Sequence, residues 1–201
     1  MLHGIPEVTD NADLRNVLRT IGDNLKADKD LTGNPHASFM MGVLEAEIKE
    51  TRYYFVASSG NYKDSDTEWT QESWIQSEHL KGISYHRGKW TMVNPTVPNG
   101  STGWLTVRGA KVGLDAGIPD VGKKCSAIKL LLALGNAHPD WGTAKLHMSE
   151  MVYVGSAATS PRMRKWHGEG ATNSWTAHSC DACEARIPYL ICDVPDNRFT
   201  N

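Results

Sequence analysis

The sequence lacks an apolar run of the roughly 20 residues that a membrane-spanning helix requires. Cysteine is scarce, with four residues in 201, which is too few for a disulfide scaffold. The formal net charge at pH 7 is only −2, so the whole chain is not expected to attract nucleic acid, and such binding would need a local basic patch. These absences argue against a membrane-spanning helix in this sequence and against a disulfide-rich scaffold.

The sequence also lacks a charged-then-apolar signal segment over residues 1–6, and it contains no internal repeat or low-complexity tract. We therefore expect no secretion signal in this chain, which is also compatible with a piece of a larger exported protein. The content of 40% hydrophobic and 22% charged residues is typical of a soluble globular protein. A chain of 201 residues can bury a sizeable core, and we predict a single domain over residues 1–201.

Hydrophobic residues recur at helical spacing over residues 11–27, which predicts an amphipathic helix with candidate caps at residues 10 and 11. A break at residues 32–35 then indicates a new helix start, with proline at its first position. We predict that this second helix runs from residue 35 to about residue 50. Its apolar side would hold Phe39, Val43 and Leu44, and its outer face a Glu45–Lys49 ion pair.

The first predicted strand spans residues 53–58. Residues 60–123 are rich in glycine, proline and tryptophan, and they contain short strand-like pieces at 89–93 and 103–108. We expect one of these pieces to pair with the first strand. The remainder, residues 61–120, is interpreted as an insertion with a core of its own, because sixty structureless residues within a domain would be unusual.

The second half of the chain has a simpler pattern. The apolar run after Cys125 predicts a helix to about residue 134, and residues 145–154 predict a strand. A long loop over 155–178 then leads to a helix that carries Cys180 and Cys183. Pro188 leaves two alternatives for residues 189–194, a kinked continuation of this helix or a last strand. The order of helices and strands predicts a layered α/β sandwich.

Three cysteines have the spacing of metal ligands. Cys125 would lie in the first turn of its helix, where exposed backbone N–H groups favour a thiolate. Cys180 and Cys183 are separated by two residues, so one helical turn can present both sulfurs. Three thiolates leave one tetrahedral position on Zn²⁺ for water, which is the geometry of a catalytic site. The alternatives are a closed structural zinc with His178 or Cys192 as fourth ligand, and no metal; Cys192 lies in an apolar stretch that favours a buried, inert thiol.

The cysteine motifs resemble those of a known family. Cys125-Ser126 at the start of a helix, a strand, and then Ser179-Cys180-x-x-Cys183 resemble the zinc-dependent nucleic-acid (cytidine) deaminase superfamily, and in particular its bacterial polymorphic-toxin branch. Residues 34–41 and 54–60 also look like the entry into those toxin domains. The resemblance covers residues 34–60 and 121–194. It implies a three-layer α/β/α deaminase-like sandwich with a central mixed β-sheet, and a family-specific insertion at 61–120.

The resemblance also implies a chemistry. Zn²⁺ held by Cys125, Cys180 and Cys183 would activate a water that attacks C4 of cytosine or C6 of adenine, and a glutamate would act as general acid and base. This chain has Ala127 where the family has that glutamate. We therefore expect the chain as written to be nearly inactive. Either the glutamate was replaced in a toxin too harmful to produce in active form, which we favour, or the chain is a natural binding-only relative.

Further side chains are candidates for the substrate pocket. Most of them have a simpler interpretation as well: a cap or surface residue at position 36, ordinary turn chemistry at 58 and 59, and a solvated loop around 162–167. Contacts with phosphate and base stacking suit the cations and aromatic residues that precede the second cysteine pair. The candidates are His36, Ser58, Ser59, Arg164, Trp166, Trp175 and His178.

The sequence thus predicts zinc-dependent hydrolytic deamination of cytosine in DNA, a choice of polymer that depends on the resemblance alone. The alternatives are deamination of RNA or of adenine, a non-catalytic zinc-stabilised nucleic-acid-binding module, and an interaction protein with incidental cysteines. The expected partners are nucleic acid and a cognate immunity protein, with no membrane. As the toxin domain of a larger exported protein, it would act in the cytoplasm of a target cell.

Overall fold

The computed structural model describes residues 8–33, 35–60, 74–83, 90–97, 104–105, 111–112, 124–155 and 187. Two helices of three turns or more and one mixed sheet make up most of this part of the chain. The elements are β1 (Val8–Thr9), α1 (Ala12–Ala27), α2 (Lys29–Thr32), β2 (Ser38–Ile48), β3 (Thr51–Ser58), η1 (Ser77–Leu80), β4 (Trp90–Met92), β5 (Trp104–Leu105), β6 (Lys111–Val112), α3 (Ser126–Ala137), η3 (Trp141–Thr143) and β7 (Lys145–Val154).

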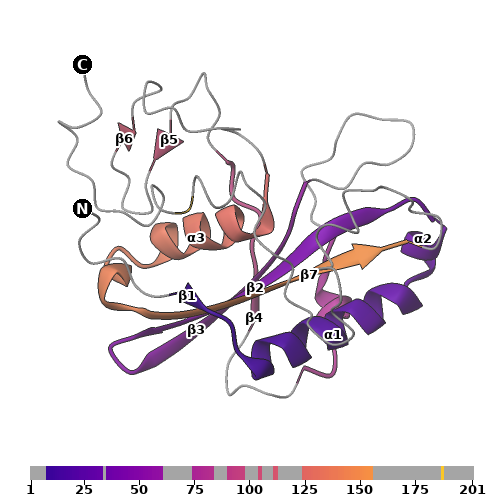
Figure 1. Cartoon of the computed structure of the whole chain (residues 1–201), viewed down its shortest axis with the longest axis horizontal. Helices are drawn as coiled ribbons and strands as arrows, with labels where there is room; N and C mark the ends of the chain where they lie inside the picture. Colours follow the sequence, from indigo (N-terminus) through magenta and orange to yellow (C-terminus); the bar gives the residue numbers. More distant parts are fainter. Residues whose placement is uncertain are drawn as a thin grey trace.

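The main sheet has five strands in the order β1-β7-β2-β3-β4 (Figure 1). The central strand β2 is antiparallel to both β3 and β7, so β3 and β7 are parallel to each other. The chain passes from β3 to β7 through α3, as parallel strands require a crossover connection. Strands β1 and β4 are the two outermost strands, and each is parallel to its neighbour. A separate pair, β5 and β6, forms a small antiparallel sheet.

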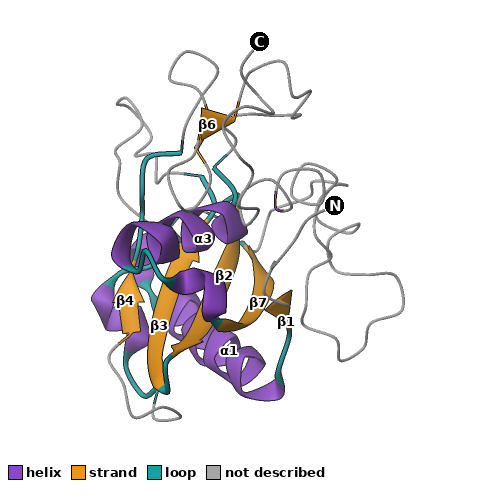
Figure 2. Cartoon of the chain, turned by 90° about the vertical axis from the view of Figure 1, so that its left-hand side faces the viewer, coloured by secondary structure: helices purple, strands orange, loops and turns teal. Residues whose placement is uncertain are grey.

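The two longer helices cover opposite faces of this sheet (Figure 2). One hydrophobic cluster joins α1 to residues such as Met41 and Val43 of β2. The other cluster joins α3 to Leu44, Ala46 and Ile48 of the same strand. Successive strand residues point to opposite faces, so β2 contributes to both cores. The described part of the chain is a mixed α/β sandwich, which confirms the predicted fold class.

Helix α1 forms where the sequence predicts it. The Asn11 side chain accepts a hydrogen bond from the Leu14 N–H at 2.8 Å and so caps the first turn. The apolar stripe along the helix is fully buried against the sheet. The predicted strands at 53–58 and 145–154 and the predicted helix after Cys125 are also confirmed, and the short piece at 90–92 pairs with β3 as expected.

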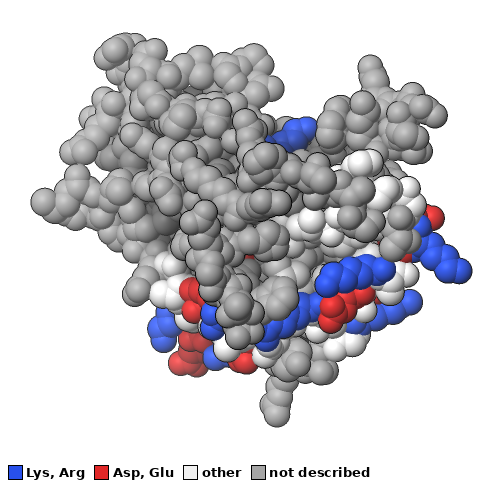
Figure 3. All heavy atoms as spheres, turned by 45° about the vertical axis from the view of Figure 1, so that its right-hand side comes forward, with Lys and Arg blue, Asp and Glu red and all other residues white. Residues whose placement is uncertain are grey.

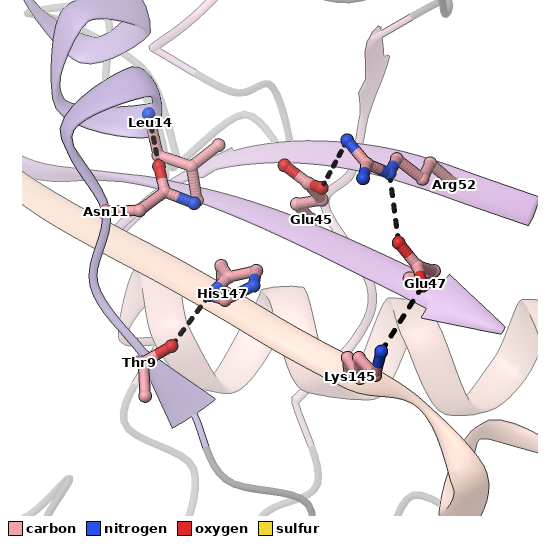
Figure 4. Close-up of polar contacts among 8 residues, drawn as sticks. All are labelled: Thr9, Asn11, Leu14, Glu45, Glu47, Arg52, Lys145 and His147. Atoms are coloured by element: carbon pink, nitrogen blue, oxygen red, sulfur yellow. Dashed lines mark hydrogen bonds and ion pairs between the residues drawn. The ribbon is translucent and has the colours of Figure 1, made fainter. Parts of the chain in front are cut away.

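The predicted second helix over 35–50 is wrong, because residues 38–48 form the central strand β2. Strand β2 returns into β3 through a two-residue turn in which Lys49 (φ 48°) and Glu50 (φ 67°) both have left-handed backbone conformations. The predicted Glu45–Lys49 ion pair is therefore also wrong. The Lys49 ammonium lies 2.8 Å from Asp140, while Glu45 pairs with Arg52 across the hairpin (Figure 4).

Several predictions lie outside the described residues. These are most of the insertion at 61–120, the loop at 155–178, the helix carrying the second cysteine pair, and the stretch 189–194. Among the described residues, no helix combines the length and apolar character needed to cross a membrane.

Candidate functional site

The described candidate residues lie on the side of the sheet where the ends of β2, β3 and β7 meet, which is called the edge from here on. Strand β2 begins at this edge, and β3 and β7 end there, as the pairings Ser38–Val154 and Met41–Ser58 show. Helix α3 starts at the same edge, because the Gly60 N–H donates to the Lys124 carbonyl at 2.7 Å. In α/β sheets, ligands commonly bind beyond the carboxyl ends of the strands. This edge is therefore the candidate functional site.

Cys125 occupies the N-cap position of α3, where its backbone is extended (φ −75°, ψ 148°). Its carbonyl accepts the first helical hydrogen bond, from the Lys129 N–H at 3.1 Å. An N-cap side chain usually accepts a hydrogen bond from the first turn, but the Cys125 side chain makes no such bond. The half-buried thiol thus lies at the positive end of the helix dipole without serving as the cap.

Glu150, a residue of strand β7, caps α3 instead. Its Oε1 accepts a hydrogen bond from the Ala127 N–H at 3.2 Å, and the Ser126 hydroxyl donates to the same oxygen. The carboxylate is only 8% exposed, and it satisfies a first-turn N–H that the helix itself cannot satisfy. A carboxylate at this position is also favoured by the helix dipole. Glu150 therefore relieves Cys125 of the capping role.

Gly42 allows the helix to approach the sheet closely enough for this contact. It lies opposite Glu150 in the register of β2 and β7. A Cβ at position 42 would lie 2.9 Å from Leu130 Cδ1 and 3.1 Å from Ser126 Cβ, so the Leu130 side chain would have to shift and Ser126 would have to give by a few tenths of an ångström. The absence of a side chain at Gly42 thus sets the distance between α3 and the sheet.

Lys129 fixes the other side of the first turn. Its residue is 1% exposed, and its Nζ donates to the carbonyls of Ser58 at 2.8 Å and Gly60 at 2.6 Å. Burial lowers the pKa of the Lys129 ammonium to about 8, and the charge of Lys124 acts in the same direction. Cys125 has the opposite effect, because its negative form attracts the ammonium. The end of β3 is thereby tied directly to α3.

Two other candidates at this edge, Ser58 and Ser59, accept hydrogen bonds from backbone N–H groups. The Ser58 hydroxyl accepts a hydrogen bond from the Trp74 N–H at 3.1 Å, and the Ser59 hydroxyl accepts one from the Met40 N–H at 2.8 Å. Both hydroxyls therefore bond backbone groups distant in the sequence rather than their own turn, and Ser59 remains half-buried. His36 is exposed in the turn before β2, at the same edge. Ala127 is fully buried in the first turn of α3.

The remaining predicted site residues lie outside the described part of the chain. The described residues contain one of the three predicted zinc ligands, Cys125, and among them no group of three or more His, Cys, Asp or Glu side chains could hold a metal ion. A thiol that does not cap its helix is compatible with a ligand role. The zinc site stays a prediction, as do the roles of Cys180, Cys183, Arg164, Trp166, Trp175 and His178.

Ser126 and Lys129 have the Ser-x-x-Lys spacing of enzymes that acylate a serine at a helix N-terminus. The contacts of Ser126 and Lys129 in this structure do not suit that chemistry. Ser126 is fully buried and donates to Glu150, whereas the Lys129 ammonium donates to the carbonyls of Ser58 and Gly60. A nucleophilic serine needs an accessible oxygen and a nearby base, and Ser126 is not accessible.

Charges of both signs are mixed on the described surface. In the view of Figure 3, Lys and Arg side chains lie beside Asp and Glu side chains. A row of such contacts crosses the sheet, where Arg52 lies between Glu45 and Glu47, and Lys145 lies 3.8 Å from Glu47 (Figure 4). In this view, the described residues form no extended patch of one sign. The loop predicted to contact phosphate, at 155–178, lies outside the described residues except for residue 155.

Comparison of the chain with protein-family models, with curated proteins and with solved structures finds no match.

The sequence did not predict that Gly42, Lys129 and Glu150 belong to this edge. The available signal was a charged residue inside an apolar stretch, since Lys129 interrupts the run from Ile128 to Leu134. Buried charges are rare unless something in the fold requires them.

Proposed function

We propose that the chain is a zinc-dependent deaminase of the bacterial toxin type, which acts on cytosine in DNA when a glutamate occupies position 127. The observation that carries this proposal is the N-terminus of α3. There, Cys125 is freed from capping by Glu150, at the edge where β3 and β7 end. The order helix α3 and then strand β7 is the one that the resemblance implies, and it supports the proposal.

Cys125, Cys180 and Cys183 would hold the metal, which when bound supplies an activated water for attack on the base. The backbone N–H groups at the start of α3 would favour the thiolate form of Cys125. The substrate would enter at the edge that carries Ser59 and His36. The nucleic acid would bind as a single strand or with the target base flipped out of a duplex.

The chain as written lacks a general acid–base at the proposed site. Ala127 has no group to accept a proton, and positioned acid–base catalysis contributes roughly 10²–10⁴-fold to rate. Glu150 does not replace the missing carboxylate, because its Oε1 is held between α3 and the sheet by the Ala127 N–H and the Ser126 hydroxyl. We therefore propose that the chain binds its substrate with little turnover.

The test compares Ala127→Glu with Ala127→Gln on labelled oligonucleotides. Uracil formed by the glutamate variant alone supports cytosine deamination, and inosine would instead identify adenine as the target. Matched RNA and DNA strands decide the polymer. Unchanged bases in a folded, zinc-loaded Ala127→Glu protein would refute the enzyme.

A non-catalytic zinc-stabilised nucleic-acid-binding module is the second candidate, because Ala127 leaves the site without a base. Both candidates require one zinc per chain, lost in Cys125→Ser. Elemental analysis of the purified protein measures this ratio. A metal-free protein would contradict both candidates and favour an interaction protein with incidental cysteines.

A further inference from the structure

Lys129 is an unusual residue for the interior of α3. Its neighbours along the helix are apolar, and it is 1% exposed. Burying an ammonium is costly unless the charge is paired. Within the described part of the chain, its Nζ donates two hydrogen bonds, and both go to backbone carbonyls rather than to a carboxylate. An apolar residue of the same length would fill this space without that cost.

The two carbonyls belong to residues 58–60, the turn in which β3 ends and the backbone bends. They come from Ser58 and Gly60, so the ammonium bridges the residues on either side of Ser59. Gly60 has a left-handed backbone (φ 65°), a conformation that glycine adopts without steric cost. Its N–H donates to the Lys124 carbonyl, which gives a third hydrogen bond between the turn and the start of α3.

The same turn is also fixed to the sheet. The Ser59 N–H donates to the Met40 carbonyl at 2.8 Å, and the Met40 N–H donates back to the Ser59 hydroxyl. The backbone of residues 58–60 is thus held between β2 and α3, beside Cys125. A pocket needs a few precisely placed polar groups to orient its ligand, and rigid support of the backbone provides them.

We propose that Lys129 is a positioning residue, which holds the turn of residues 58–60 against the first turn of α3 so that this turn forms one wall of the substrate site. The identity of the substrate as a pyrimidine base in a nucleic-acid strand rests on the proposed function. The bridge itself does not. Lys129 acts through the turn and does not touch the base.

The test compares Lys129→Met with Lys145→Met in the chain as written. Methionine keeps the length of the side chain and removes the ammonium, while Lys145, with a side chain 81% exposed, loses the same charge far from the turn. Three quantities are measured: the thermal midpoint, amide hydrogen exchange at Gly60, and affinity for a cytosine-containing single-stranded oligonucleotide. The residue Ala127 is kept, so that binding is measured without turnover.

For Lys129→Met we expect Gly60 exchange to be faster by about tenfold or more, because its hydrogen bond to the Lys124 carbonyl opens locally. We expect an affinity about tenfold weaker than that of Lys145→Met, with a thermal midpoint that is unchanged or higher. A residue that served only the stability of the fold would lower the midpoint and the affinity together.

The proposal is overturned if Gly60 exchange is unchanged, if both lysine variants weaken binding equally, or if Lys129→Met does not fold. If none of the proteins, including the unmodified chain, binds the oligonucleotide, the proposed function fails. The Gly60 exchange rates then still decide whether Lys129 positions the turn.

Discussion

Removing the carboxylate of Glu150 should loosen the start of α3 and lower the stability of the whole domain. Glu150 is 8% exposed and accepts hydrogen bonds from the Ala127 N–H and the Ser126 hydroxyl. Glu150→Leu leaves both donors buried without a partner. Glu150→Gln keeps an acceptor oxygen and removes only the charge, so the pair separates hydrogen bonding from charge.

The magnitudes follow from these contacts. Hydrogen bonds to a charged group contribute about 1.5–3 kcal/mol each, and the buried leucine side chain returns part of the loss of two such bonds. We expect Glu150→Leu to lower the free energy of unfolding by about 3 kcal/mol, or roughly 10 °C in the thermal midpoint for a chain of this size. Glu150→Gln should lose about 1 kcal/mol, the typical contribution of a helix cap or of a charge at a helix end.

The assay is urea unfolding followed by tryptophan fluorescence, with Trp141 as a reporter that is 1% exposed in the native state. Glu47→Gln is the matched control, because its carboxylate is 27% exposed and pairs with Arg52 on the surface. A surface pair contributes about 0–1 kcal/mol, so the control should stay close to the unmodified chain. Glu150→Leu with unchanged stability would refute the capping role. An equal loss in both Glu150 variants would assign the effect to charge alone.

Gly42→Ala should cost about 1–3 kcal/mol, because its Cβ would lie 3.1 Å from Ser126 Cβ in the first turn of α3, an atom that cannot rotate away as the nearby Leu130 methyl can. Gly22→Ala in α1 should be neutral or stabilising by up to about 1 kcal/mol, since its Cβ would meet only flexible methionine methyl groups; thermal unfolding compares the two. For Asp28, burial raises the carboxyl pKa, but hydrogen bonds from a backbone N–H and from His79 outweigh it and hold the pKa below 3.8. The free energy of unfolding should therefore be larger for the unmodified chain than for Asp28→Asn above pH 3.8. Urea titrations should show that this difference is lost as the pH falls through the pKa of Asp28 in the folded state. The pKa of Lys129 is about 8 folded and 10.5 unfolded, so the unfolded chain binds more protons between these values. The stability of the unmodified chain relative to Lys129→Met should thus rise by up to about 3 kcal/mol from pH 8 to 10.5 in urea titrations, and a flat difference would contradict the burial of a charged lysine.

The elements that the sequence predicts correctly are those buried on one side or punctuated clearly. Helix α1 lies on one face of the sheet, so its apolar residues keep helical spacing, and Asn11 marks its start. Helix α3 begins where the apolar run begins, with Cys125 at the N-cap rather than inside the first turn.

Strand β2 was not predictable from periodicity for a physical reason. Its apolar residues on the α1 side lie in the first half of the strand, whereas those on the α3 side begin at Leu44 and continue to its end. The two sets meet at Val43 and Leu44, so residues 39–44 form a continuous apolar run that fits a helix as well as a strand. Only the alternation of Glu45 and Glu47 with apolar neighbours in its second half favours a strand. The turn at Lys49 and Glu50 lacks the Asn-Gly or Asp-Gly signal typical of such hairpins, and it adopts positive φ angles nonetheless.

The candidate site was predictable only in part. The position of Cys125 follows from local pattern, but the contacts that organise its surroundings join residues far apart in the sequence. Glu150 reaches Ser126 across 24 positions, and Lys129 reaches Ser58 across 71. Such pairings depend on the register of β3 and β7 against β2. The sequence predicted β2 as a helix, so this register could not be predicted.

The most direct test of the account is to sequence the genomic DNA of cells that produce the Ala127→Glu protein beside cells that produce Ala127→Gln. We predict an excess of C-to-T transitions in the first population only, with flanking bases that report the preferred context. Mutation spectra that are indistinguishable between the two populations, with both proteins folded and zinc-loaded, would contradict deamination of cytosine in DNA.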